Sequence, residues 1–368
     1  MKKLFAILLA LSLLLCGCSV AVDLGDGNEI IIEVGSDGSI QGGVASNTAD
    51  PDSDLTVHFI DVGQADCILL ESGGEFLLID GGNRDDGQLV VSYLQSCGVE
   101  ELEAVVCTHA HEDHVGGLPA VLAVFPTKAV YAPTNTYSSK IFDDFLYYTD
   151  QQRLEVTIPS PGDKLAVGQV DLTVMGPVMT YAEPNDISIV LLAKFGQNRM
   201  LFTGDMETTA ENDMLDYWEG RMDWNIDLLK AGHHGSSSSS GYRFLYETDP
   251  EYTVISCGKD NSYGHPHEEV VSRFNDAEIP MLRTDELGSV LVVSDGQELV
   301  ITWENQKAAP SRIEPGEGAK KYFVGNKNSA TFHAPDCDSL PKEANRIYYD
   351  SYKQAIEAGG VPCGGCLG

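Results

Sequence analysis

Residues 104–114 read Ala104-Val105-Val106-Cys107-Thr108-His109-Ala110-His111-Glu112-Asp113-His114, an apolar run that leads directly into histidines and carboxylates. The apolar residues predict a short buried strand, and the polar residues follow at its end. Burying three imidazoles and a carboxylate would be costly unless something paired with them. Imidazole and carboxylate ligands suit Zn²⁺, with Mn²⁺ or Fe as alternatives. The sequence therefore predicts a metal site at the end of this strand.

Composition sets the limits within which this site must work. The chain has 368 residues, 43% of them hydrophobic, with 23 Lys and Arg against 56 Asp and Glu, a formal net charge of -33. This apolar content can bury a core and excludes a wholly disordered chain. The negative charge argues against nonspecific nucleic-acid binding over the whole surface, but a local site with metal ions remains compatible. A chain this long favours about two domains.

Strand and helix patterns alternate from residue 55 to residue 304. Sheets packed together and covered by helices fit such an arrangement. The expected helices are 87–96, 116–124, 206–218 and 267–276. The expected strands include 104–107, 129–131, 170–175, 187–194, 199–203, 226–230, 252–256, 289–293 and 298–303.

Five motifs accompany the histidine cluster in a fixed order. They are His58-Phe59-Ile60-Asp61-Val62-Gly63-Gln64-Ala65-Asp66, Leu78-Ile79-Asp80-Gly81-Gly82, Leu201-Phe202-Thr203-Gly204-Asp205, Leu229-Lys230-Ala231-Gly232-His233-His234-Gly235-Ser236 and Tyr263-Gly264-His265-Pro266-His267. The combination resembles the metallo-β-lactamase superfamily, and more narrowly its ComEC-type branch, the extracellular domain associated with competence DNA-uptake channels. The resemblance covers residues 55–304 and implies an α/β fold, the four-layer αββα sandwich.

The resemblance also implies a site for two metal ions. His109 and His111 would bind one ion, and Asp113 and His114 the other. Asp205 would bridge both. Two metal ions roughly 3.5–4 Å apart can activate a water molecule as a nucleophile at neutral pH, and Asp113 or Asp205 can accept its proton.

Other positions are less settled by the resemblance. His233, or alternatively His234, would complete the second metal site. Asp80 would hold in place the loop at 108–114, which we call the histidine loop. The family has a histidine about twenty residues before Asp205, where this chain has Asn185. Asparagine is a poor zinc ligand, so the first ion would be weakly held; a turn residue is the alternative interpretation of Asn185.

His265 and His267 are candidates for protonating a leaving group or contacting a phosphate. The alternative is that the pair marks the solvent-facing start of the helix predicted at 267–276.

A second metal pattern lies at the C-terminal end. Residues 305–320 predict a linker, and residues 321–368 a small module with His333, Cys337, Cys363 and Cys366. Four such ligands suffice for one structural Zn²⁺, and a segment this small needs a metal or a staple. The module is similar to the metal-binding module of the Ada DNA-repair protein, which has cysteine where His333 stands. Disulfide pairing is the alternative.

The N-terminal residues predict export. Residues 1–18 combine Lys2 and Lys3 with an apolar run at 4–15, which is typical of a signal peptide. The run ends in Leu15-Cys16-Gly17-Cys18, which resembles a bacterial lipobox, so we expect Cys18 to carry lipid on the outer face of the cell membrane. Ordinary cleavage and free secretion is the alternative. Residues 19–54 have acidic residues and no Lys or Arg, and predict a flexible tether with a strand only around 30–32.

These features together predict a lipid-anchored, metal-dependent hydrolase of phosphodiesters, with extracellular DNA as the favoured substrate and no nucleotide cofactor. Hydrolysis of a small phosphoester or another ester is the alternative enzymatic hypothesis. A non-catalytic, metal-bearing binding lipoprotein is the hypothesis from a different class.

Overall fold

The computed structural model describes residues 20–25, 28–34, 40–45, 54–308, 323–335 and 337–367. The chain divides into two compact units, residues 1–52 and 53–368. The signal peptide with Cys18, and most of the linker predicted at 305–320, lie outside the described residues. None of the helices in the described ranges has the length and apolar composition to cross a membrane.

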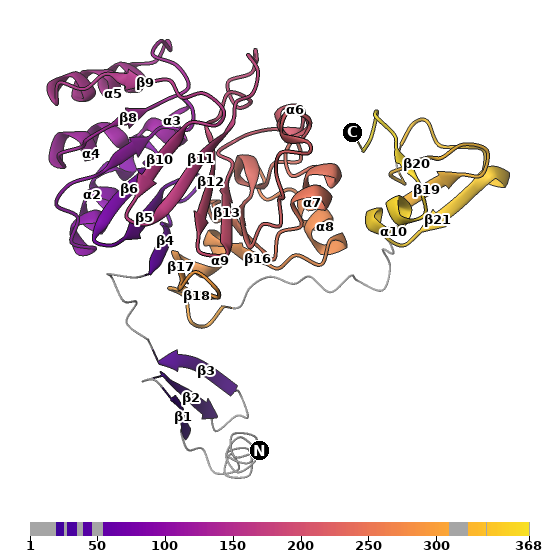
Figure 1. Cartoon of the computed structure of the whole chain (residues 1–368), viewed down its shortest axis with the longest axis horizontal. Coiled ribbons are helices and arrows are strands. Elements are labelled where there is room, and N and C mark those ends of the chain that lie inside the picture. Colours follow the sequence, from indigo (N-terminus) through magenta and orange to yellow (C-terminus); the bar gives the residue numbers. More distant parts are fainter. Residues whose placement is uncertain are drawn as a thin grey trace. The chain divides into compact units, whose positions relative to one another are not determined.

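The first unit contains strands where the sequence predicts a flexible tether. β1 (Val20–Gly25), β2 (Asn28–Val34) and β3 (Ile40–Ala45) form an antiparallel sheet in that order (Figure 1). The strand expected around 30–32 lies inside β2, which pairs with a neighbour on each side. Hairpin pairing satisfies backbone groups that a tether would leave to water.

Two large sheets form the body of the second unit. The eight-stranded sheet runs, in spatial order, β18 (Leu299–Trp303), β17 (Val290–Ser294), β4 (Leu55–Phe59), β5 (Ile68–Ser72), β6 (Glu75–Ile79), β7 (Ala104–Val106), β8 (Val130–Tyr131) and β9 (Val156–Thr157). The seven-stranded sheet runs β10 (Lys164–Val167), β11 (Val170–Gly176), β12 (Val190–Phe195), β13 (Asn198–Phe202), β14 (Leu228–Lys230), β15 (Tyr252–Ile255) and β16 (Met281–Arg283).

Alternation along the strands places a core on each face of each sheet. In β5, Ile68 and Leu70 join the core between the two sheets, whereas Leu69 joins the core beneath the helices. The rings of Phe59 and Phe202 meet across the central core with centroids 6.2 Å apart. A strand buried on both faces must be apolar throughout, which explains the short continuous apolar runs in the sequence.

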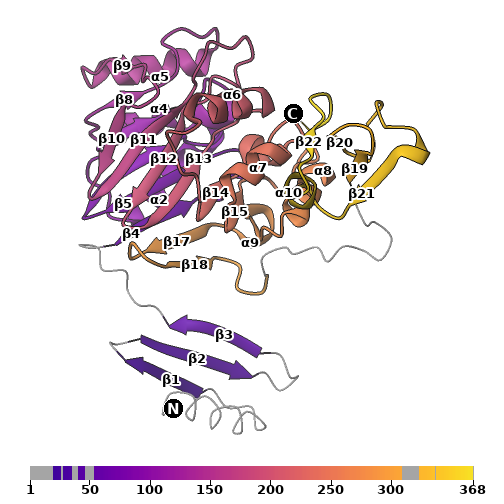
Figure 2. The same ribbon diagram turned by 45° about the vertical axis from the view of Figure 1, so that its right-hand side comes forward.

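Helices cover the outer face of each sheet (Figures 1 and 2). α2 (Gly87–Ser96), α4 (Leu118–Val124) and α5 (Lys140–Gln151) contribute to the core over the eight-stranded sheet. α6 (Thr208–Trp218), α7 (Tyr242–Thr248) and α8 (Glu268–Asp276) cover the seven-stranded sheet. The predicted αββα sandwich is confirmed. No helix is predicted at α5 from the sequence; its first turn is capped by the Ser139 side chain, which accepts from the Phe142 N–H.

The predicted metal residues follow parallel strands. β6 pairs parallel to β7, and β13 pairs parallel to β14 in the other sheet. Parallel neighbours end at the same edge, so the residues that follow them converge there. The helical turn α3 (Glu112–Val115) starts within the histidine cluster. Gly117, shortly after α3, packs directly against the backbone of Gly81. An added Cβ at Gly117 would lie 2.1 Å from the Gly81 carbonyl oxygen, which explains why only glycine fits.

The C-terminal module has its own small sheet and core. Its strands are, in spatial order, β21 (Arg346–Tyr349), β19 (Phe323–Asn326), β20 (Thr331–His333) and β22 (Val361–Pro362). One helix, α10 (Tyr352–Glu357), accompanies the sheet. Phe323, Phe332 and Tyr352 form the buried core of the module, and Tyr242 of α7 packs against it.

Candidate metal centre

The histidine loop is held by a carboxylate from the neighbouring strand. Asp80 follows β6 with a positive φ of 58°, and its carboxylate accepts from the Thr108 N–H (2.7 Å) and the Thr108 hydroxyl (2.6 Å). Its Oδ2 also lies 2.8 Å from Nδ1 of His114. A hydrogen bond at Nδ1 leaves Nε2 of His114 to face the site. Asp80 therefore lies where the sequence predicts it, against the loop and not among the candidate ligands.

Four side chains from both sheets form a compact group. Ligand atoms of Asp113, His114, Asp205 and His234 all lie within 4.8 Å of one another. Oδ1 of Asp205 is 3.2 Å from Nε2 of His114 and 3.6 Å from Nε2 of His234. These three buried atoms have no hydrogen-bond partner. Since buried polar atoms are rarely left without partners, three that converge on one point fit a bound cation.

A second group lies on the other oxygen of Asp205. Its Oδ2 is 3.8 Å from Nε2 of His109 and 3.8 Å from Nε2 of His233. His111 joins this group, with its Nδ1 3.0 Å from Nε2 of His109. Asp205 therefore faces one set of imidazoles with each oxygen, as a carboxylate that bridges two metal ions would.

The structure corrects the expected order of the two consecutive histidines. The sequence favours His233 for the group that contains Asp113 and His114, but His234 lies there. His233 and His234 both have left-handed backbone angles, with φ of 46° and 54°, so both rings reach Asp205. An extended backbone would send neighbouring side chains to opposite faces.

Asn185 lies in a turn, as the alternative interpretation has it, with its carbonyl accepting from the Ser188 N–H (3.0 Å), and its side chain lies beside His233. Its Nδ2 donates to Oε1 of Glu207 (3.1 Å) and lies 3.3 Å from Nδ1 of His233. Glu207 itself accepts from His233 Nδ1 at 3.0 Å. The buried Oδ1 of Asn185 has no hydrogen-bond partner. Glu207 thus fixes the ring of His233, and the Asn185 oxygen remains available at the edge of the second group, which contains His233.

The charges of the site suit a cation. Burial would raise the pKa of Asp205, but His114 and His234 hold it well below its ordinary value. Burial would also raise the pKa of Asp113, which His114 and His234 likewise lower. Burial and the neighbouring His114 lower the pKa of His109 well below its ordinary value, so its lone pair is free for a ligand bond. Burial would lower the pKa of His114 and of His234, but Asp205 and the neighbouring carboxylates raise the first well above its ordinary value and the second to about 10. A bound cation would take the place of these protons, because Zn²⁺ binds ionised carboxylates and neutral imidazoles.

The C-terminal module forms a second candidate site. Ligand atoms of His333, Cys337, Cys363 and Cys366 lie within 4.8 Å of one another. The three cysteines are free thiols, so the structure does not contain the alternative disulfide pairing among them. The backbone N–H of Ala334 donates to the sulfur of Cys366 at 3.4 Å. One His and three Cys in this arrangement fit a closed tetrahedral Zn²⁺ site.

Sequence profiles of known families match both sites. The profile of the metallo-β-lactamase superfamily matches residues 60–259, more than half of the chain. The chain belongs to the metallo-β-lactamase superfamily. The profile of the metal binding domain of Ada matches residues 317–367, which contain the four ligands of the C-terminal module.

Relatives among known proteins include competence and recombination proteins. ComE operon protein 3 of Bacillus subtilis (strain 168) is 27% identical over 257 residues, 65% of this chain and 33% of that protein. Competence protein ComA of Neisseria gonorrhoeae is 30% identical over 243 residues, 65% of this chain and 32% of that protein. Recombination protein 2 of Haemophilus influenzae is 29% identical over 262 residues, 69% of this chain and 31% of that protein. The chain spans about one third of the length of these relatives, and the predicted ComEC-type resemblance is confirmed.

His265 borders the centre of the metallo-β-lactamase domain with one free ring nitrogen. The Gly258 N–H donates to Oε1 of Gln64 (3.0 Å), which orients the Gln64 amide so that Nε2 donates to Nδ1 of His265 (3.2 Å). In a neutral ring, Nε2 then carries the hydrogen. Burial and the nearby His233 lower the pKa of His265 to about 4, so the ring is neutral at pH 7. His265 can donate a hydrogen bond to a substrate oxygen, but it is not a reservoir of protons at that pH.

His267 lies where the alternative interpretation places it, at the start of a helix, directly before α8. Its Nδ1 accepts from the Ser237 N–H at 2.9 Å, and its Nε2 lies 3.1 Å from the Tyr263 carbonyl oxygen. Both ring nitrogens are therefore used by the backbone, because a carbonyl oxygen can only accept. His267 holds the loop at 236–240, which we call the serine loop, and has no nitrogen left for a substrate.

Sequence reasoning missed three polar residues next to the ligands. Asp66 contacts His234, Lys230 contacts Asp66, and Glu207 contacts His233. Lys230 carried the clearest signal, since a lysine inside the apolar strand β14 must have a buried partner. Asp66 and Glu207 carried none, because their partners come from distant parts of the chain.

Two cavities flank the centre. One, of about 310 Å³, adjoins His111 and is lined also by Arg84, Glu112, Tyr137 and Lys140. The other, of about 620 Å³, is lined by His265. The cavity beside His111 gives a substrate access to one of the candidate ligands.

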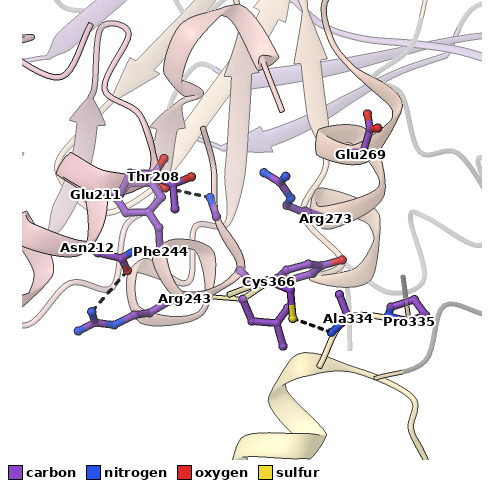
Figure 3. A pocket seen from close by; sticks show the side chains of 13 residues that line it. Thr208, Glu211, Asn212, Arg243, Phe244, Glu269, Arg273, Ala334, Pro335 and Cys366 are labelled. Carbon is purple, nitrogen blue, oxygen red and sulfur yellow. Dashed lines mark hydrogen bonds between the residues drawn. The ribbon is translucent and has the colours of Figure 1, made fainter. Parts of the chain in front are cut away.

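A third cavity, of about 340 Å³, lies between the metallo-β-lactamase domain and the C-terminal module (Figure 3). Glu211 and Arg273 line it and fix the serine loop. The carboxylate of buried Glu211 accepts from the backbone N–H of Ser240 (2.5 Å) and Gly241 (2.9 Å). The guanidinium of Arg273 donates to three carbonyl oxygens of the serine loop. This loop directly follows His233 and His234.

We expect the two consecutive histidines to serve different ions. His234→Ala should weaken one of the two zinc-binding events of the metallo-β-lactamase domain, and His233→Ala the other, each by more than the roughly 10–100-fold that loss of an outer partner costs. Calorimetric zinc titration of the purified variants measures this. His58→Gln is the matched control, since His58 contacts Tyr93 and Glu71 away from the cluster. Loss of the same event in both alanine variants would contradict the assignment.

Stability should depend on pH through Glu211. Burial raises the pKa of Glu211 from 4.5 to about 7, although the N–H groups of Gly241 and Ser240 oppose this. The folded protein therefore holds this proton more tightly than the unfolded chain, and stability falls as pH rises from 4.5 through about 7. The loss is roughly 3 kcal/mol. The free energy of unfolding of Glu211→Gln, measured in denaturant at several pH values, should lack this decline. Glu219→Gln, at an exposed site, should parallel the wild type.

Proposed function

We propose that the chain is a metal-dependent hydrolase that cleaves phosphodiesters, with extracellular DNA as its substrate. The observation that carries this proposal is the bridging position of Asp205, whose two oxygens face two groups of imidazoles. The unpartnered buried atoms of His114, His234 and Asp205 support it. A structural site would need only one closed set of ligands.

The residues around the centre have separable roles. Bound metal ions would polarise a phosphoryl oxygen and make water a nucleophile at neutral pH. Asp113, partly exposed and ionised, can accept a proton from that water. His265 can donate its Nε2–H to a phosphate oxygen. Asn185 can orient water at the second group.

Two observations favour nucleic acid over other phosphodiesters. The relatives named above are competence and recombination proteins. The cavity beside His111 offers Arg84 and Lys140 for phosphate and Tyr137 for base stacking. The chain's charge of -33 opposes a polyanion at long range, so the local cations and metal ions have to supply the attraction.

The test compares DNA cleavage with and without metal. The protein is incubated with single-stranded and duplex DNA in Zn²⁺ or Mn²⁺, and with a chelator. We expect cleavage that the chelator abolishes and that Asp113→Ala lowers at least about 100-fold, because a proton acceptor is lost. Asp171→Ala, at an exposed carboxylate paired with Lys164, is the matched control and should cleave like the wild type.

Two further substrates distinguish the alternatives. Cleavage of bis(p-nitrophenyl) phosphate or p-nitrophenyl acetate without cleavage of DNA would replace the nuclease by a hydrolase of small phosphoesters or esters. Metal binding without turnover of any of them would establish the binding lipoprotein instead.

We also propose that the protein is anchored at the outer face of the cell membrane by lipid on Cys18. The proposal rests on the sequence before and at Cys18, which lies outside the described residues. In bacterial cells, the wild type should partition into detergent-extracted membranes, and Cys18→Ala should not, because the lipid would be missing. Membrane partitioning of both proteins alike would contradict a lipid anchor.

A further inference from the structure

Asp66 lies at the junction of the two sheets, in the loop between β4 and β5. It is 1% exposed. Its backbone N–H donates to the Asp113 carbonyl oxygen (3.1 Å), and its carbonyl accepts from the Gly82 N–H (2.8 Å). Its carboxylate faces the other sheet, with Oδ1 3.3 Å from Nδ1 of His234. One residue thus connects the histidine loop of one sheet to the histidine pair of the other.

The contacts of His234 determine which nitrogen can bind metal. Its Nδ1 lies 3.0 Å from the Ser256 carbonyl oxygen, which can only accept a hydrogen bond. Nδ1 therefore carries hydrogen, and Nε2 is the nitrogen left for a metal ion. Nε2 faces Asp113 Oδ2 at 3.3 Å and Asp205 Oδ1 at 3.6 Å. Asp66 Oδ1 makes no hydrogen bond within the described residues, so Asp66 acts on the ring through its charge, which lies on the Nδ1 side and favours the orientation that presents Nε2 to the centre.

Lys230 explains how Asp66 can remain there. The Lys230 side chain is fully buried, with Nζ 2.9 Å from Asp66 Oδ2 and 2.7 Å from the Ala231 carbonyl oxygen. An unpaired buried carboxylate is costly, so a fixed ammonium next to it compensates. Lys230 does not contact the candidate ligands and is too enclosed to meet a substrate. Its role is exerted through Asp66.

A parallel arrangement serves the other sheet. Asp80 is hydrogen-bonded to Nδ1 of His114 at 2.8 Å, whereas Asp66 faces Nδ1 of His234 at 3.3 Å as an ion-pair partner. Asp80 is compensated by the N–H and hydroxyl of Thr108, both hydrogen-bonded to it. Asp66 is compensated instead by a positive charge, the ammonium of Lys230 in β14.

We propose that Asp66 is a positioning residue that orients His234 for metal binding, and that Lys230 is the buried cation that holds Asp66. The inference deepens the proposed function, because it concerns the same metal centre. It predicts that metal affinity depends on the Asp66–Lys230 pair, even though neither residue is a ligand.

The test is a Co²⁺ titration of the whole protein followed by visible absorption and calorimetry. Asp66→Asn should weaken one Co²⁺-binding event of the metallo-β-lactamase domain by roughly 10–100-fold and alter its absorption. The other event should be unchanged. The sulfur-to-cobalt absorption of the C-terminal module serves as an internal reference for a folded, loaded protein. Asp285→Asn is the matched control, because it loses a largely buried carboxylate that is paired with a cation, Arg283, away from the candidate ligands.

The double variant separates positioning from stability. Lys230→Met should lower the unfolding midpoint, because it leaves Asp66 buried without its cation. Asp66→Asn combined with Lys230→Met removes both charges and should recover the midpoint but not the Co²⁺ affinity. Wild-type Co²⁺ affinity in a folded double variant would overturn the proposal. The titration uses no substrate, so failure to cleave DNA would refute the proposed function and leave this result standing.

Discussion

A single buried carboxylate, Asp205, is the group on which the rest of this site depends. It is 1% exposed and lies within 3.8 Å of imidazole nitrogens from His109, His114, His233 and His234. A buried carboxylate needs positive charge or hydrogen bonds around it, and imidazoles facing it with free lone pairs need a cation. His109 and His114 follow a strand of one sheet, whereas Asp205, His233 and His234 follow strands of the other. The carboxylate and the imidazoles therefore meet only because both sets of strands end at the same edge of the sandwich. The fold therefore positions the site, and a metal ion would complete it.

The charges around the metal centre differ from the net charge of the whole protein. The surface carries a large acidic excess, yet the centre combines carboxylates with imidazoles, a buried lysine and nearby Arg84 and Lys140. Long-range repulsion of a polyanion is screened beyond about 8–10 Å at physiological ionic strength, whereas contacts at the centre are not. An acidic protein can therefore act on a phosphodiester if its site supplies the cations.

The C-terminal module is joined to the metallo-β-lactamase domain through aromatic side chains. The rings of Tyr242 and Phe323 meet with centroids 5.0 Å apart, and those of Tyr242 and Tyr352 stack at 5.7 Å. Tyr242 begins α7 directly after the serine loop, which Glu211 and Arg273 fix. The module thus packs against α7, which follows His233, His234 and the serine loop in the chain. Within the second unit, its metal site is therefore connected to the metallo-β-lactamase centre through α7 and the serine loop.

Local pattern in the sequence determined the histidine loop and the four candidate ligands of the C-terminal module, because strand ends and ligand spacing are properties of short segments. The αββα class and the places of Asp80 and Asp205 came from the resemblance of short motifs to a known family. The tertiary structure alone decided that His234, and not His233, joins Asp113 and His114, since this follows from consecutive left-handed backbone angles. It also decided that His267 is occupied by the backbone, and that Asp66 meets Lys230 and His234. Such contacts join residues up to about 168 positions apart (Asp66 to His234), and no local pattern encodes which side chains meet when two sheets pack face to face.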